Sequence, residues 1–338
     1  GKTNLALQFS RGAVARRESV LYFPLSAQRD EQDEVAESHG WTLDGITLRE
    51  LVSSESTLHP EEQYTMFHPA DVELSETTKS ILEDVEKTRP TRVVFDSLSE
   101  LRLLAGNALR YRRQILALKQ YFAGRQCTVL LLDDLTSEDR DLQVQSIAHG
   151  VLLLEQLNPE YGAERRRLRV IKFRGVKFRG GYHDYTISRG GLTVFPRLVA
   201  SEHRKDIVLS RMPTGLAPLD ALLGGGIERG TSTMIVGPPG TGKSTMTAQF
   251  ALAAAQRGER TLMLIFDESR STLIGRAQGL GIDLTGPMEA GLITIQQMDP
   301  AELSPGEFAH SIRRAVEDND TAIIVIDSLN GYLAAMPS

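Results

Sequence analysis

The chain has 338 residues, 41% of them apolar and 24% charged, with a formal net charge of −6. This composition is typical of a globular protein of about two domains, and no apolar run approaches the roughly 18 residues of a membrane span. The acidic balance disfavours nucleic acid as a general partner. The single cysteine, Cys127, excludes an internal disulfide. We expect it to be buried and reduced, in a cytoplasmic protein.

The first residues of the chain match a later segment. Residues 1–9 align without a gap on residues 242–250, and matches continue at Glu18/Glu259 and Leu21/Leu262. The sequence therefore predicts two tandem nucleotide-binding modules, the first without its opening strand and most of its phosphate-binding loop. We expect a first module at 1–200, a linker at 201–211 and a truncated second module at 212–338, as a piece of a longer protein.

The first module alternates helical patterns with short apolar runs. The predicted strands, all buried and parallel, are 20–25, 92–95, 128–132 and 150–154, and the predicted helices are 31–39, 77–88 and 107–123. This alternation favours an α/β fold with a mainly parallel sheet and helices on both faces. Residues 167–195 instead alternate apolar and polar side chains between glycines, which indicates antiparallel edge strands.

Residues 237–245 form a complete phosphate-binding loop, Gly-Pro-Pro-Gly-Thr-Gly-Lys-Ser-Thr. We predict a strand over 233–236 before it and a helix over 246–256 after it. Glycines let backbone N–H groups converge on phosphate oxygens, and the helix N-terminus favours negative charge. Lys243 is expected to reach the β- and γ-phosphates of ATP, and Ser244 to bind Mg²⁺. The predicted nucleotide-binding residues are Gly237, Gly240, Thr241, Gly242, Lys243, Ser244 and Thr245, with Gly1, Lys2 and Thr3 as their counterparts in the first module.

Two apolar strands end in an aspartate downstream of each loop. They read Arg-Val-Val-Phe-Asp-Ser at 92–97 and Ala-Ile-Ile-Val-Ile-Asp-Ser at 322–328. In nucleotidases of this class such an aspartate orients the magnesium ion or its water. A helix cap after the strand is the alternative, but two copies at matching places favour the metal role. We therefore predict that Asp96 with Thr3, and Asp327 with Ser244, bind Mg²⁺.

The second module carries two carboxylates, Asp267 and Glu268, at a predicted strand end between the loop and Asp327. A carboxylate there can hold and deprotonate the water that attacks the γ-phosphate. We predict Glu268 as the general base with Asp267 beside it; a solvated acidic turn is the alternative. The first module has Ser26 and Ala27 at these positions, so we expect it to bind ATP but to hydrolyse it poorly.

Five further motifs lie at 40–43, 172–175, 180–187, 214–227 and 266–269. With these motifs the chain resembles, over essentially its whole length, the KaiC-like family of RecA-type ATPases, which are often built as tandem modules. The resemblance implies a homohexameric double ring with ATP between subunits, ATPase activity, sometimes Ser/Thr autophosphorylation, and a role in clock-type timing or signalling. The trans-acting lysine and arginine of the family map onto Lys172 and Arg174, which strand periodicity places on one face.

The leading hypothesis is thus an ATP-driven oligomeric switch. One alternative is a DNA-dependent motor like RecA or RadA, in which basic residues after Asp96 line a pore; these are Arg102, Arg110, Arg112 and Arg113. Another is a Ser/Thr kinase that acts on itself or on a signalling partner with the same ATP site. The phosphorylation sites of the family map beyond Ser338, and no partner surface can be read from the sequence.

Overall fold

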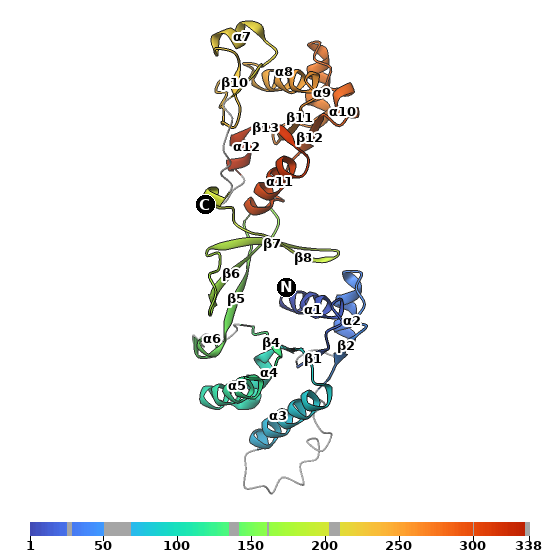
Figure 1. The fold of residues 1–338 in the computed structure, drawn as a ribbon, viewed down its shortest axis with the longest axis vertical. Helices are drawn as coiled ribbons and strands as arrows, with labels where there is room; N and C mark the ends of the chain where they lie inside the picture. Colours follow the sequence, from blue (N-terminus) through green and yellow to red (C-terminus); the bar gives the residue numbers. More distant parts are fainter. Residues whose placement is uncertain are drawn as a thin grey trace. The chain divides into compact units, whose positions relative to one another are not determined.

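The computed structural model describes residues 1–25, 29–50, 69–134, 142–160, 162–202, 210–299 and 301–334. The chain divides into two compact units (Figure 1). Unit 1 comprises 1–154, 168–181 and 186–194, and unit 2 comprises 155–167, 182–185 and 195–338. None of the helices in these described ranges is long and apolar enough to cross a bilayer.

Unit 1 contains a parallel sheet. Its strands are β2 (Ile46–Leu48), β1 (Val20–Pro24), β3 (Arg92–Asp96) and β4 (Thr128–Leu131), in that spatial order, and every adjacent pair is parallel. The parallel strands predicted at 20–25, 92–95 and 128–132 are confirmed. The expected burial of β4 and of Cys127 is wrong: β4 is an edge strand, so its side chains are half-buried or exposed and Cys127 is partly exposed.

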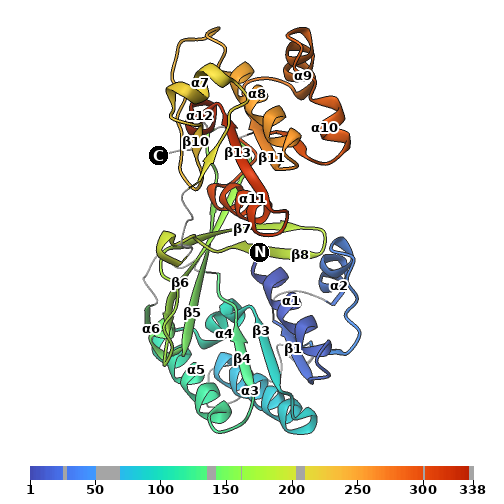
Figure 2. The ribbon, with the colours of Figure 1, turned by 45° about the horizontal axis from the view of Figure 1, so that its top comes forward.

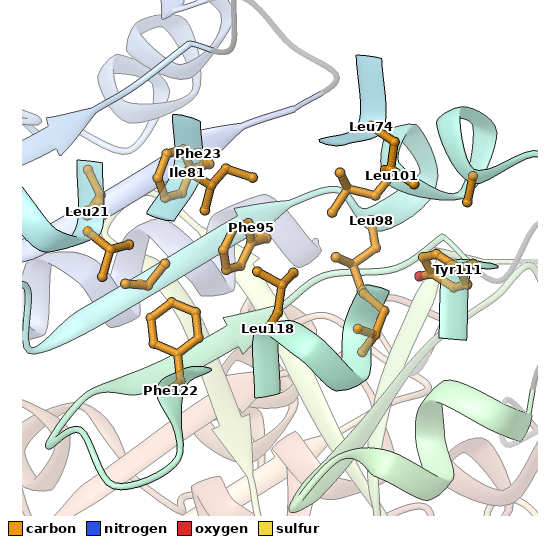
Figure 3. Close-up of a cluster of buried hydrophobic side chains, with 14 residues drawn as sticks. Leu21, Phe23, Leu74, Ile81, Phe95, Leu98, Leu101, Tyr111, Leu118 and Phe122 are labelled. Atoms are coloured by element: carbon orange, nitrogen blue, oxygen red, sulfur yellow. The ribbon is translucent and has the colours of Figure 1, made fainter. Parts of the chain in front are cut away.

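Helices cover both faces of this sheet, as its side-chain alternation requires. Val20, Tyr22 and Val94 pack beneath α1 (Lys2–Val14) and α2 (Arg29–Ser38). On the opposite face, Leu21, Phe23 and Phe95 pack against α3 (Pro69–Thr88), α4 (Leu98–Ala105) and α5 (Ala108–Phe122), as Figure 3 shows. The helices predicted at 31–39, 77–88 and 107–123 correspond to α2, α3 and α5. The α/β prediction is therefore confirmed.

A second sheet follows α6 (Leu142–Ile147). It contains β5 (Gly150–Leu157), β6 (Arg165–Phe173), β7 (Tyr182–Ser188) and β8 (Gly191–Phe195), each hydrogen-bonded to the next. Their connections are too short for crossover helices, so neighbouring strands run antiparallel. Residues 167–195 form strands as predicted, but β6 and β7 lie in the middle of the sheet, so the expected edge position is right for β8 alone. Residues 150–154 are not a buried parallel strand. They lie in β5, where Leu152 is 50% exposed, because a short loop pairs β5 with β6.

Unit 2 contains a parallel sheet of β12 (Ile293–Gln297), β11 (Arg260–Ile265) and β13 (Thr321–Asp327). One face packs on α8 (Lys243–Gln256), α9 (Arg270–Gly279) and α10 (Thr285–Glu289), and the other on α11 (Pro305–Glu317). The remaining elements are η3 (Ala200–Glu202), β9 (Arg211–Met212), α7 (Ala217–Leu222), β10 (Ile227–Glu228) and α12 (Leu329–Ala334). Figure 2 shows α8 beside β11.

The helix predicted after the phosphate-binding loop is confirmed as α8, but the strand predicted over 233–236 is absent. Residues 232–238 have no regular secondary structure, and Met234 and Val236 are 70% and 84% exposed. A strand needs a neighbour to satisfy its backbone groups. Within the described ranges β13 forms its ladder with β11 alone, and 233–236 does not pair with the open edge of β13, so this segment has no ladder.

Candidate functional site

The phosphate-binding loop of the second module ends at the N-terminus of α8. Gly242 is the N-cap of this helix, with a φ of 88°, and Gly240 has a φ of 82°, which is backbone that glycine adopts without strain. A Cβ on Gly237 would lie 2.7 Å from Thr241 Oγ1. The loop is therefore closed tightly enough that its backbone can approach a ligand.

The ammonium group of Lys243 lies over this loop. It donates hydrogen bonds to the carbonyl oxygens of Gly237 at 2.8 Å and Pro238 at 2.9 Å. Both partners are neutral, so among the described residues no carboxylate neutralises this charge at hydrogen-bond distance. Ser244 follows in the first turn of α8. A cation, a helix N-terminus and a glycine-lined loop form an arrangement that binds phosphate.

The carboxyl ends of β11 and β13 place the acidic residues together. Ile265 pairs with Asp327, and Phe266 N–H donates to Asp327 O at 2.8 Å, so Asp267 follows directly beside this strand end. Ser328 Oγ donates to Asp267 Oδ2 at 2.5 Å and accepts from Gly331 N–H at 3.1 Å. Asp267 is thus hydrogen-bonded to the residue that follows the predicted metal ligand.

Two carboxylate oxygens here are buried and have no hydrogen-bond partner: Asp327 Oδ2 and Glu268 Oε2. A buried anionic oxygen without a donor costs free energy unless a cation or a proton donor occupies the site. Asp327 Oδ2, with the hydroxyl of Ser244, has the chemistry that Mg²⁺ prefers. The residues of the second module therefore fit a magnesium–nucleotide complex.

Glu268 is held by an ion pair that the sequence did not reveal. Its Oε1 accepts from the Arg276 guanidinium at 2.7 Å, and the Glu268 side chain is 18% exposed. Arg276 lies on α9, whose N-cap Ser269 accepts a hydrogen bond from Thr272 N–H. Arg276 thus restrains Glu268 while its second oxygen keeps the capacity to accept a proton.

The first module repeats this strand register. Pro24 pairs with Asp96, and Leu25 N–H donates to Asp96 O at 2.6 Å, which matches the bond between Phe266 and Asp327. Asp96 is 7% exposed, and its Oδ2 accepts from the buried Tyr22 hydroxyl at 2.6 Å. Burial, followed by the Asp96 charge, raises the pKa of Tyr22. The predicted positions Ser26 and Ala27 lie outside the described residues.

Lys2 and Thr3 begin α1, as Lys243 and Ser244 begin α8, and Gly1 is its N-cap. Lys2 Nζ donates to Asp133 O at 3.0 Å and pairs with the Asp134 carboxylate. The Lys2 ammonium, with the hydroxyls of Ser99 and Ser97, lowers the pKa of Asp134 to about 2. Unlike Lys243, Lys2 therefore has an acidic partner in this structure.

Lys172 and Arg174 converge on the carboxyl end of α6. Lys172 Nζ donates to Gln145 O at 2.5 Å and Ser146 O at 3.3 Å, and the Arg174 guanidinium donates to Ser146 O at 3.0 Å. Lys119, on α5, donates to Ile147 O at 2.8 Å. Partial desolvation, then the charges of Arg174 and Lys119, lower the pKa of Lys172. Lys172 lies in β6 and Arg174 directly after it, so both side chains project to the same side.

The structure thus brings together Asp267 and Ser328 in unit 2, and Lys172 and Arg174 in unit 1. Sequence reasoning missed Tyr22, Ser97, Arg276 and Ser328. The repeat itself offered a signal for two of them, because Ser97 and Ser328 follow the paired aspartates at matching positions. The peptide bonds Asp96–Ser97 and Asp327–Ser328 are also both cis. No sequence signal pointed to Tyr22 or Arg276, whose roles depend on side-chain direction.

A sequence model of the family described as "ATPase: KaiC" matches residues 1–199 and 212–337. The chain is similar to the circadian clock oscillator protein KaiC of Thermostichus vulcanus, with 27% identity over 98% of this chain and 64% of that protein. It is also similar to the protein of the same name from Acaryochloris marina, with 26% identity over 98% of this chain and 63% of that protein. The protein of that name from Synechococcus elongatus is 26% identical over 98% of this chain and 64% of its own length. The chain therefore spans somewhat less than two thirds of the length of these curated relatives.

Proposed function

Because this chain belongs to the KaiC family of ATPases, we propose that the full-length protein binds ATP with Mg²⁺ between neighbouring subunits of a homohexameric ring. It hydrolyses ATP mainly in the second module and acts as a clock-type or signalling switch. The observation that carries this proposal is the cradle of the second module. There the Lys243 ammonium lies over a tight glycine loop at the N-terminus of α8, and its hydrogen-bond partners among the described residues are backbone carbonyls.

Binding of the triphosphate is the first step. Phosphate oxygens compete for Lys243 with the carbonyls of Gly237 and Pro238, and an anion is the stronger partner for an ammonium group. The N–H groups around Gly240 and Gly242 turn toward the phosphates. Ser244 and Asp327 would hold the magnesium ion, which would supply positive charge to offset the negative charge that develops on the phosphoryl group.

Hydrolysis needs a group that takes a proton from water. Glu268 performs this role through its unpartnered Oε2, while Arg276 holds its other oxygen. The carboxylate of Asp267, which accepts a hydrogen bond from the Ser328 hydroxyl, helps to orient the site around Glu268. A positioned general base contributes about 10²–10⁴-fold to the rate of such a reaction. In the first module, where alanine and serine occupy these positions, ATP is bound and turned over slowly.

Lys172 and Arg174 complete the first-module site of the neighbouring subunit. In the structure described here they bind backbone carbonyls, which an incoming γ-phosphate outcompetes. Cations supplied from a neighbour are worth about 10³–10⁵-fold in phosphoryl transfer. The second module would be completed in the same way by residues outside the present sequence.

The experiment is ATP binding and turnover by the full-length protein. Lys243→Ala should abolish nucleotide uptake by the second module in calorimetry, whereas Glu268→Gln should keep uptake and lower the steady-state turnover by about 10²–10⁴-fold. Unchanged uptake in Lys243→Ala would refute the assignment of the cradle. Full turnover in Glu268→Gln would refute the assignment of the base.

The same assay distinguishes the other activities. Stable labelled phosphoprotein after incubation with γ-labelled ATP would show that the site acts as a Ser/Thr kinase on itself or on a signalling partner. Tight single-stranded DNA binding that weakens steeply with salt would instead indicate a DNA-dependent motor. The structure gives that motor less support, because Arg102 already pairs with Asp133 at 2.6 Å and lies over the Tyr111 ring.

A further inference from the structure

A polar network centred on His39 joins α1 to the β7–β8 hairpin. His39 Nε2 lies 2.8 Å from Asn4 Nδ2, and His39 Nδ1 lies 2.9 Å from Ser188 O. The backbone takes part as well, since Gly190 N–H donates to His39 O at 3.2 Å. His39 is 9% exposed. A buried imidazole thus connects a helix and a hairpin that are far apart in the sequence.

The partners determine the state of this imidazole. A carbonyl oxygen only accepts, so Nδ1–H donates to Ser188. The Asn4 amide donates through Nδ2, so Nε2 accepts. One neutral tautomer of His39 satisfies both contacts, and an apolar side chain would satisfy neither. The network therefore depends on a residue that donates on one side and accepts on the other.

Close packing surrounds the network. The Trp41 ring lies 4.6 Å from the His39 ring, centroid to centroid, and Gln8 on α1 exchanges two hydrogen bonds with the backbone of Leu192. A Cβ on Gly191 would lie 2.5 Å from the Trp41 ring and 2.7 Å from Gln8 Oε1. Because Gly191 is packed closely against Trp41 and Gln8, a displacement of α1 is expected to be transmitted to this part of the hairpin. Figure 2 shows α1 next to β7 and β8.

The two ends of the network are chemically distinct. Asn4 lies in the first turn of α1, directly after Lys2 and Thr3. Ser188 ends β7, and β7 is the hydrogen-bonded neighbour of β6, which carries Lys172. One end therefore lies beside the residues proposed to hold a subunit's own nucleotide. The other end lies in the strand next to β6, whose opposite end carries the cations proposed for the neighbour.

We propose that Asn4 and His39 are positioning residues that couple neighbouring first-module sites, so that these sites bind ATP cooperatively around the ring. This inference rests on the proposed function, because it needs ATP at Lys2 and Thr3 and Lys172 acting in trans. ATP orders the start of α1 and so fixes the positions of Asn4, His39 and Ser188. The position of β6 follows, because β6 is hydrogen-bonded to the strand that Ser188 ends. The neighbour's site is then already complete when its ATP arrives, so its affinity is higher.

The test is ATP binding by the full-length protein that carries Lys243→Ala, so that uptake reports the first-module sites. With a fluorescent ATP analogue as the probe, this background should bind with a Hill coefficient above 1. His39→Phe fills the space of the ring but offers neither contact. It should lower the Hill coefficient to 1 and raise the half-saturating concentration by about 5-fold or more, as expected when coupling of ordinary strength is lost.

Two further variants separate coupling from structural support. His39→Gln, whose amide also donates and accepts, should retain a Hill coefficient above 1. Ser38→Ala is the matched control, because the exposed Ser38 hydroxyl donates within its own helix, to Val35 O; it should bind like the background. If His39→Phe does not fold by circular dichroism, Asn4→Leu, which leaves the ring in place, should give the same loss of cooperativity.

Several results would overturn the coupling. One is an unchanged Hill coefficient in folded His39→Phe or Asn4→Leu. Another is a Hill coefficient that falls as far in Ser38→Ala or His39→Gln as in His39→Phe. A third is a Hill coefficient of 1 in the Lys243→Ala background itself. Absence of uptake in the background, with uptake by the unmodified protein intact, would overturn the coupling and the ATP binding proposed for the first module, while ATP binding and hydrolysis by the second module would stand. Absence of uptake by the unmodified protein would refute the proposed function itself.

Discussion

The hydroxyl of Tyr22 donates to Asp96 Oδ2 at 2.6 Å, whereas the corresponding oxygen of Asp327 has no hydrogen-bond partner. The difference arises one strand away. Tyr22 and Met263 occupy matching positions in β1 and β11, where they pair with Val94 and Val325. Tyr22 points to the sheet face that α1 covers, and Met263 to the face that α8 covers. Within the described residues the first module thus supplies a hydrogen-bond donor to its aspartate, and the second module does not.

Tyr22→Phe should therefore destabilise unit 1. It removes a buried hydrogen bond to a carboxylate, which is worth about 1.5–3 kcal/mol, and Tyr22 is fully buried. Chemical denaturation of the chain would measure the change in the free energy of unfolding. Tyr121→Phe is a suitable control, because the Tyr121 hydroxyl donates to Glu86 near the surface and its loss should cost less. Equal effects of the two variants would show that the Asp96 contact carries no special stability.

Ser328→Ala should slow ATP turnover more than it weakens ATP binding. The Ser328 hydroxyl holds Asp267, and a small displacement of a catalytic group can cost up to about 10²-fold in rate. We expect a 10- to 100-fold lower turnover of the full-length protein in steady-state kinetics, with little change in calorimetric affinity. Ser269→Ala, which removes the N-cap of α9, should cost about 1 kcal/mol of stability and retain most of the turnover. A similar loss of rate in both variants would argue against an orienting role for Ser328.

Cys127 should react slowly with thiol reagents while the chain is folded. Desolvation raises the pKa of its thiol from 9.0 to about 11. The thiolate is the reactive form, so its fraction at pH 8 falls by about 100-fold when each pKa unit counts tenfold. Because the folded pKa is raised, the neutral thiol adds stability that is lost as the pH rises from about 9 toward 11. Absorbance with an aromatic disulfide reagent, with and without denaturant, would measure the rates; equal rates would contradict the prediction.

Gly226→Ala should destabilise unit 2, where β9 and β10 meet. Gly226 has a φ of 114°, and a Cβ would lie 2.2 Å from the backbone oxygen of Met212. Backbone cannot move aside as a flexible side chain can, and strain of this kind costs about 1–3 kcal/mol. Denaturant midpoints would report the change.

Gly275→Ala provides the opposite control. Gly275 lies within α9, and a Cβ there would meet nothing within 4 Å. Alanine restricts the unfolded chain and favours helix, so this variant should gain about 0.5–1 kcal/mol. If both substitutions shifted the midpoint in the same direction, crowding at Gly226 would not explain its effect.

Local pattern was sufficient to predict most of the elements and part of the site. The apolar runs that end at Asp96 and Asp327 became β3 and β13, parallel strands of two separate sheets, because their side-chain composition suits a sheet covered by helices. The loop at 237–245 carried its own chemistry in its glycines and in Lys243. Pattern did not predict that 150–154 would pair with β6, or that 233–236 would remain without a strand partner. Both outcomes depend on how segments distant in the chain pair, which local pattern does not specify.

The sequence by itself therefore determined that this is an α/β protein with paired phosphate-binding modules and acidic strand ends, since those features follow from residue type and spacing. Only the tertiary structure decided which oxygens of the acidic groups are satisfied, as with Asp96 and Asp327, and that His39 joins Asn4 to Ser188. The physical reason is that spacing governs backbone conformation and the face on which a side chain lies. The partner of a side chain depends on packing among residues that are distant in the chain.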